Sequence, residues 1–141
     1  MRGDVIPDDN HVSRHCPQKS VIDGRVQPTA FMLRNNEASL SVNWLEILSC
    51  TNRAEEIATI RDIFLSKGYD LRPRAKLAIL NVGTVRFKVL NERPDNRNLQ
   101  FTHEPDALDP SHSGIYNLMP DNELIAELIT QTIIETYPAP S

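Results

Sequence analysis

Residues 38–68, ASLSVNWLEILSCTNRAEEIATIRDIFLSKG, decide the predicted fold because a strand pattern is followed directly by a helix pattern. At the start of this stretch Leu40, Val42 and Trp44 alternate with polar residues. Side chains of a strand point alternately to its two faces, so this alternation predicts a sheet with one buried face.

The helix pattern begins at Asn52, where Asn52 and Glu55 have the spacing of a capping box. Apolar residues then recur at helical spacing up to Phe64, and Gly68 follows as a C-terminal stop signal. These signals predict one helix between Asn52 and Gly68.

Similar patterns outside this stretch predict the other elements. We expect strands at 29–34, 76–82, 84–90 and 99–103, and a final helix at 121–136. The second and third of these strands could also be one long strand bent at Gly83. Turn residues and prolines predict an irregular N-terminal arm at 1–28 with a short strand at 10–15, a long structured loop at 104–120 and a tail at 137–141.

Together these elements predict one domain, residues 1–141, of the α+β class. Its predicted order is β-β-α-β-β-β-α, with a mostly antiparallel sheet of about five strands and two helices packed on one face.

Composition excludes some classes of protein. No apolar run approaches the roughly 20 residues of a membrane helix, and the acidic start lacks a signal-peptide pattern. The chain has only two cysteines, so we expect no disulfide framework and a cytoplasmic location. The net charge of −4 makes nucleic acid an unlikely partner.

Charge is unevenly distributed along the chain. Residues 53–97 carry ten basic and six acidic side chains, whereas residues 98–141 carry seven acidic side chains and no Lys or Arg. The acidic end is therefore expected either to dock on the basic middle of the same fold or to face a partner.

All four histidines lie in two windows, which suggests a metal site. His11 and His15 precede Cys16, and His103 and His112 lie in or next to the 104–120 loop. If the arm packs against the loop, these imidazoles could converge as ligands of zinc or another transition metal. The spacing matches no closed zinc motif, and four unrelated histidines are the alternative.

A second possibility is nucleophilic catalysis. Cys16 would be the nucleophile, His11, His103 or His112 the base, and Asp109 the residue that orients it. The alternative is that Cys16 is a small buried hydrophobic residue.

A third possibility is a pocket for a small anionic or nucleotide-like ligand. Arg14, Arg34, Asn43 and Glu46 would supply polar groups and Trp44 a stacking wall. No glycine-rich phosphate motif is present, the sequence leaves any cofactor unknown, and Trp44 could instead belong to the core.

Ile134 and Tyr137 suggest a protein interface, because Ile134 lies opposite the apolar stripe of the predicted final helix. The leading functional hypothesis is a cytoplasmic binding or accessory protein that acts through protein contacts or self-association. The alternative is a small enzyme or metal protein with a His/Cys/Asp site between the N-terminal arm and the 104–120 loop.

Overall fold

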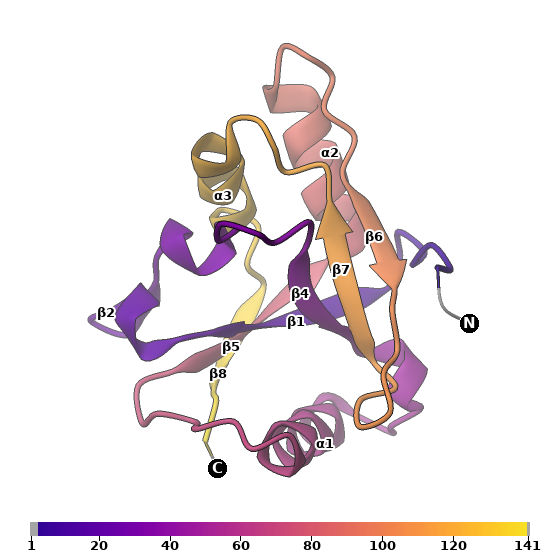
Figure 1. The fold of residues 1–141 in the computed structure, drawn as a ribbon, viewed down its shortest axis with the longest axis vertical. Coiled ribbons are helices and arrows are strands. Elements are labelled where there is room, and N and C mark those ends of the chain that lie inside the picture. Colours follow the sequence, from indigo (N-terminus) through magenta and orange to yellow (C-terminus); the bar gives the residue numbers. More distant parts are fainter. Residues whose placement is uncertain (1–2, 141) are drawn as a thin grey trace.

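The computed structural model describes residues 3–140 and contains a six-stranded antiparallel sheet in the order β6-β7-β4-β1-β5-β8 (Figure 1). Its strands are β1 (His11–Cys16), β4 (Leu40–Trp44), β5 (Lys76–Asn81), β6 (Gln100–His103), β7 (His112–Tyr116) and β8 (Glu135–Pro138). The α-helices are α1 (Arg53–Ser66), α2 (Val82–Glu92) and α3 (Asn122–Thr130). A small second sheet pairs β2 (Val21–Ile22) with β3 (Arg25–Val26), and short 3₁₀ helices are η1 (Gln18–Ser20), η2 (Pro28–Phe31) and η3 (Glu46–Leu48). The α+β class and the antiparallel sheet are confirmed.

Helices cover both faces of the sheet, which corrects the prediction of two helices on one face. Leu77 and Ile79 of β5 pack with α1, whereas Ala78 and Leu80 belong to the larger core with α2, α3 and η2. A strand that is apolar on both faces requires cover on both. The sheet therefore has a large closed core on one face and a smaller α1 core on the other.

Helix α2 occupies the region predicted as a strand at 84–90. The Asn81 side chain caps it by accepting hydrogen bonds from the Thr84 amide and hydroxyl, both at 2.9 Å. A Cβ at Gly83 would lie 2.9 Å from the Asp8 carbonyl oxygen, so the first turn approaches the N-terminal arm closely. The β-branched valines of this segment indicated a strand, but the cap and burial of one helix face prevail.

Three other boundaries differ from the prediction. The 104–120 region contains strand β7, and 29–34 forms η2 and a following irregular segment instead of a strand. The final helix ends at Thr130, and the chain then turns to form β8. None of the helices in the part of the chain that the structure describes is both long and apolar enough to cross a bilayer.

The N-terminal arm is built into the sheet. Its strand β1 lies between β4 and β5, and the preceding segment runs along the edge of β6 (Figure 1). The Ile6 amide donates to the Phe101 carbonyl oxygen at 2.9 Å, and the His103 amide donates to the Asp4 carbonyl oxygen at 2.8 Å. The arm thus covers one edge of the sheet.

The acidic end docks on the basic middle of its own fold. Ion pairs join Lys67 to Asp106 at 3.0 Å, Arg93 to Asp121 at 2.6 Å and Arg53 to Glu135 at 3.1 Å. The first of the two expected consequences of the uneven charge is therefore present in the structure. These pairs are partly exposed, so each contributes little to stability and more to specificity of docking.

Candidate functional site

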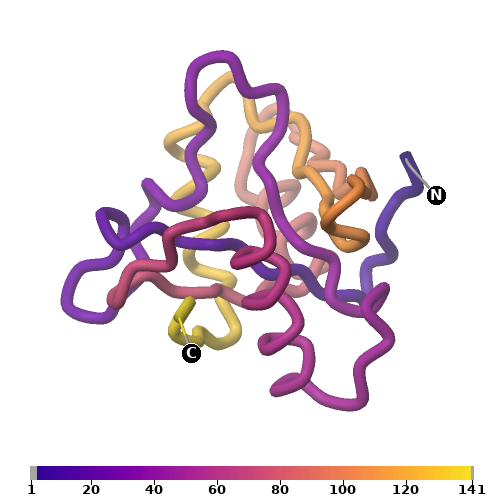
Figure 2. Tube along the Cα trace, turned by 60° about the horizontal axis from the view of Figure 1, so that its bottom comes forward, coloured from indigo at the N-terminus to yellow at the C-terminus, as the bar shows by residue number. Residues whose placement is uncertain are grey.

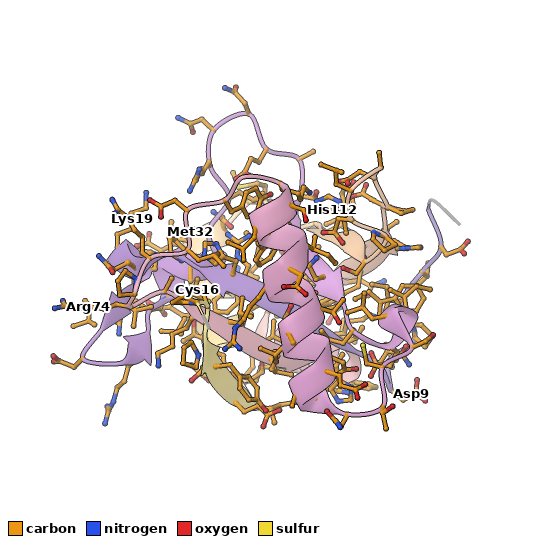
Figure 3. All side chains as sticks on the ribbon, turned by 90° about the horizontal axis from the view of Figure 1, so that it is seen from below. Asp9, Cys16, Lys19, Met32, Arg74 and His112 are labelled. Atoms are coloured by element: carbon orange, nitrogen blue, oxygen red, sulfur yellow. The ribbon has the colours of Figure 1, made fainter. Side chains whose placement is uncertain are left out.

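A polar pocket of about 260 Å³ opens on the α1 face of the sheet, beyond the C-terminal end of α1. Much of its chemistry comes from Arg14, His15, Arg34, Ser41, Lys67 and His112. Figure 3 shows His112 near one end of α1, on the face that this helix covers. These residues are distant in sequence. The sheet brings Arg14, His15, Ser41 and His112 together because β1, β4 and β7 lie side by side, and Arg34 and Lys67 come from the segments that follow η2 and α1.

The pocket begins where strands β1 and β4 separate. Their ladder contains the pairs Val12 with Trp44 and Ser13 with Asn43. At the next position of β1 the guanidinium of Arg14 enters the gap, where Nε donates to the Ala30 carbonyl oxygen and Nη1 to the Ser41 carbonyl oxygen, both at 2.8 Å. The side chain replaces backbone pairing, and this fixes the position of its positive charge.

Arg14 is a partly buried cation whose positive charge is not balanced by a carboxylate of the described chain in an ion pair. Burial lowers its pKa, although the Cys16 thiol and Glu37 act in the opposite direction. Within residues 3–140, Arg14 forms no ion pair, and no hydrogen bond to its Nη2 is found. A buried charge that lacks an ionic partner is costly, so an anion at this position would be stabilising.

His112 is held in one tautomer. Its Nδ1 lies 2.9 Å from the Glu104 carbonyl oxygen, which can only accept, so Nδ1 carries a hydrogen. In the neutral ring Nε2 is then an acceptor, and it lies 3.4 Å from the Ser41 hydroxyl. This arrangement leaves a basic nitrogen next to a hydroxyl group within the pocket.

His15 occupies the neighbouring position on β1. Burial lowers its pKa, and the charge of Arg14 lowers it further, which favours the neutral ring. The ring packs edge-on against Phe64 with centroids 5.6 Å apart, and Phe64 in turn stacks on Tyr69 at 5.1 Å. The buried Nε2 of His15 has no hydrogen-bond partner in the described part of the chain.

A buried network supports the floor of the pocket. Asp109 is 1% exposed and accepts hydrogen bonds from the Ser111 amide and hydroxyl at 2.9 and 2.6 Å and from Asn43 Nδ2 at 2.7 Å. Asn43 also donates to the Ser111 hydroxyl at 2.8 Å. Through these hydrogen bonds Asp109 connects the loop before β7 to strand β4.

Lys67 and Asp106 close one side of the pocket with their ion pair. Burial is the largest single effect on Lys67 and lowers its pKa, but the hydrogen bond to Asp106 and the charges of Tyr69, Asp106 and Asp109 together outweigh it, so the net shift of the pKa is upward. The same hydrogen bond lowers the pKa of Asp106, whose side chain also accepts from the Leu108 and Asp109 amides at 3.0 and 2.9 Å. Lys67 is thus charged and tied to the loop that carries Asp109.

Arg34 lies at the mouth of the pocket and is exposed. Its backbone amide donates to Glu37 Oε1 at 2.7 Å, whereas its guanidinium forms no ion pair among the described residues. Glu37 and the buried Asp109 are the carboxylates that line this pocket. Arg14 and Arg34 therefore provide two positive charges that no carboxylate pairs with directly.

The predicted ligand-binding residues are divided between the two faces. Arg14, Arg34 and Asn43 line the pocket, but Trp44 packs against the large core and contacts the His103 ring at 5.0 Å. Adjacent residues of a strand face opposite ways, so Trp44 cannot form a wall beside Asn43. The stacking role for Trp44 is therefore wrong. Glu46, which the same prediction included, pairs with His11 at 2.6 Å instead.

The predicted nucleophile, Cys16, is buried in the large core. Its Sγ lies 3.4 Å from the Arg14 carbonyl oxygen, and burial raises the pKa of the thiol to about 12, although the charge of Arg14 opposes the shift. A thiol of this kind is not ionised near neutral pH. The catalytic role of Cys16 is corrected to that of a core residue, and His11, held by Glu46, does not line the pocket.

The four histidines predicted as metal ligands do not come together. His15 and His112 line the pocket, whereas His11 pairs with Glu46 and His103 lies buried beside Trp44 with Nε2 2.7 Å from the Pro110 carbonyl oxygen. Within residues 3–140, no group of three or more His, Cys, Asp or Glu side chains could hold a metal ion. The residues present do not support the metal hypothesis.

The predicted interface residues lie at the far edge of the sheet. Ile134 is 54% exposed in the turn before β8, and its amide donates to the Ile79 carbonyl oxygen at 2.9 Å. Tyr137 is half-buried against the α1 core. Ile134 is therefore exposed as expected, but in a turn and not on a helix.

Sequence reasoning missed Ser41, Lys67 and Tyr69 as pocket residues. Ser41 could have been found, because the alternation of β4 places it on the same face as Asn43. Lys67 and Tyr69 follow the end of α1 and carry no local signal of their own. Comparisons with protein families, curated proteins and solved structures find no match for this chain.

Proposed function

We propose that this protein binds the phosphate group of a small organic ligand in the pocket between β1, β4, β7 and the end of α1. The observation that carries the proposal is Arg14, whose guanidinium is fixed by two backbone carbonyls and has no ionic partner in residues 3–140. Two fixed hydrogen bonds orient its remaining N–H groups, and a planar fork of donors is the group best suited to a phosphate.

Neighbouring groups favour phosphate over a simple carboxylate. Arg34 adds a cation with no ionic partner among the described residues, and Lys67 adds one that is paired with Asp106. The Ser41 hydroxyl and the neutral His15 ring add polar groups around the same space. Phosphate offers more acceptor oxygens than a carboxylate and a higher charge near neutral pH. The pocket of about 260 Å³ is large enough for a phosphate and a small attached group.

The arrangement of His112 and Ser41 supports cleavage of the phosphate ester as well as binding. Nε2 of His112 accepts a proton from a water molecule as the water oxygen bonds to phosphorus. The ester P–O bond breaks, and the same proton passes from His112 to the departing alkoxide. Arg14 and Lys67 stabilise the charge that develops on the phosphate oxygens. The reaction is hydrolysis of the phosphate ester and consumes only water.

Phosphate binding is tested by calorimetric titration with inorganic phosphate and with the Arg34→Gln variant. Arg34 is exposed, so the substitution leaves the fold intact, and loss of one charge-assisted contact weakens binding about 10-fold. Arg72→Gln is the matched control, since Arg72 is 65% exposed and pairs with Asp70 away from the pocket. Absence of saturable binding, or equal affinity in the Arg34 and Arg72 variants, would contradict the proposal.

Self-association is a second candidate, favoured by the exposure of Ile134 next to the outer strand β8. Two features make this edge a poor site for adding another strand. Pro138 lacks an N–H group, and Arg61 already donates to the Pro138 and Ala139 carbonyl oxygens at 2.7 and 3.2 Å. Self-association therefore stays a prediction that ranks below phosphate binding. The cytoplasmic location also stays a prediction.

A further inference from the structure

A second hollow of about 340 Å³ adjoins the phosphate pocket. Arg14, Pro17 and Arg34 line both spaces, so these residues form the boundary between the two hollows, which together are called the cleft. In Figure 3 Lys19 and Met32 of the second hollow and His112 of the first lie along the same side of the molecule. Figure 2 shows the 32–39 segment beside the chain that follows β7, in agreement with the hydrogen bond from Asn122 to the Leu33 carbonyl oxygen at 3.5 Å.

The second hollow differs in chemistry from the first. Pro17, Met32 and Leu33 give it an apolar wall, and no carboxylate lines it. Its hydroxyl groups are engaged with each other, because Thr29 donates to Ser20 at 2.9 Å. This surface is suited to a flat and mainly apolar group, for which Met32 provides an adaptable contact.

Lys19 stands at the exposed part of the second hollow. It lies at the end of η1, and it forms no ion pair with any residue that the structure describes. The cleft therefore contains cations in both hollows: Lys67 lines only the first, Lys19 lines only the second, and Arg14 and Arg34 line both. Such an arrangement matches a ligand with two anionic groups separated by an apolar body.

We infer that the ligand is a nucleotide with phosphate groups on two sides of its sugar, an inference that rests on the proposed function. One phosphate lies in the first pocket between Arg14, Arg34 and Lys67. The nucleoside lies against Met32 and Leu33, and the second phosphate contacts Lys19. The two hollows, about 260 and 340 Å³, together provide a space of the size that such a ligand requires.

Calorimetric titration with inorganic phosphate, ribose 5-phosphate, adenosine 5′-monophosphate and adenosine 3′,5′-bisphosphate tests this inference. We expect adenosine 5′-monophosphate to bind about 10-fold more tightly than ribose 5-phosphate, because the base covers apolar surface. The bisphosphate should bind about 5- to 10-fold more tightly again, because Lys19 adds a charge-assisted contact.

Two variants assign these gains to the second hollow. Lys19→Ala should reduce the affinity for the bisphosphate to that for the monophosphate without changing the affinity for inorganic phosphate. Met32→Gln should remove the advantage of the monophosphate over ribose 5-phosphate, with thermal melting used to check the fold. Lys88→Ala is the control, since Lys88 pairs with Glu92 on α2 at 3.3 Å.

The outcomes separate this inference from the proposed function. If none of the four compounds binds, the phosphate pocket itself is wrong. Suppose instead that phosphate binds with an affinity that depends on Arg34. The nucleotide inference alone is then overturned if the adenosine compounds bind no more tightly than ribose 5-phosphate, or if Lys19→Ala does not change the affinity for the bisphosphate.

Discussion

Arg14 and Arg97 are both arginines withdrawn from solvent, and they differ in how their charge is compensated. Arg97 is 9% exposed, and its Nη1 donates to the carbonyl oxygens of Asn117, Leu118 and Pro120 at 3.1, 3.4 and 2.9 Å. Its Nη2 pairs with Asp95 at 2.7 Å. Arg14 has two carbonyl partners and no carboxylate within the described chain.

This difference separates a structural arginine from a candidate ligand-binding arginine. The protein itself satisfies Arg97, which ties the loop before β6 to the chain that follows β7. Around Arg14 the protein supplies two hydrogen bonds that fix the guanidinium, and the residue lines a pocket. Incomplete compensation of a fixed buried charge is expected where a ligand completes the site.

The largest expected effect is on stability in Arg97→Met. The substitution keeps a long apolar side chain but leaves three carbonyl oxygens without their donor. We expect the free energy of unfolding to fall by about 3 kcal/mol, as for loss of several hydrogen bonds to a charged group. Urea unfolding measures this change, and Arg72→Met serves as an exposed control. A loss no larger than that of the control would show that the Arg97 contacts do not stabilise the fold.

A smaller effect on stability, with a large effect on binding, is expected for Arg14→Met. The Ala30 and Ser41 carbonyl oxygens lose the Arg14 donor, but they adjoin a pocket where water can replace it. The substitution also removes the free-energy cost of burying the Arg14 cation. The free energy of unfolding should therefore change by about 1 kcal/mol or less. Affinity for inorganic phosphate should fall about 10- to 100-fold. A stability loss as large as that of Arg97→Met would place Arg14 in the same structural class.

The sequence predicted the local elements better than their assembly. Alternation in residues 40–44 identified β4, and the Asn52 cap identified α1, because both signals are local. The α2 segment was predicted as a strand because Val82, Val85 and Val89 also suit a strand. The Asn81 cap and the burial of one helix face decide in favour of a helix.

The candidate site shows the same division. Arg14, Arg34, Asn43, Asp109 and His112 were predicted by residue type, and all five line the pocket. Their convergence could not be derived, because it depends on β1 entering the sheet between β4 and β5 and on β7 pairing with β4. The N-terminal arm was expected to be irregular with a short strand at 10–15, and nothing in its sequence indicated that this strand lies in the middle of the sheet.

The smallest predicted effect concerns pH and His15. Burial and the charge of Arg14 lower the pKa of His15 in the folded protein below its ordinary value of 6.5. As pH falls through about 6.5, the unfolded chain takes up a proton that the folded chain resists. This group therefore contributes a loss of stability on acidification, which continues down to the folded pKa.

His15→Phe removes this contribution while keeping an aromatic ring against Phe64. Urea unfolding of both proteins between about pH 8 and pH 5 should give a smaller loss of stability on acidification in the variant. Bound phosphate should reduce the difference, because an anion beside Arg14 favours the protonated ring. Parallel stability curves in the absence of phosphate would contradict the lowered pKa. If the stability curves of the two proteins are parallel only when phosphate is bound, the anion lies close enough to His15 to offset the charge of Arg14. In that case a ligand compensates the charge of Arg14, whereas the protein itself compensates the charge of Arg97.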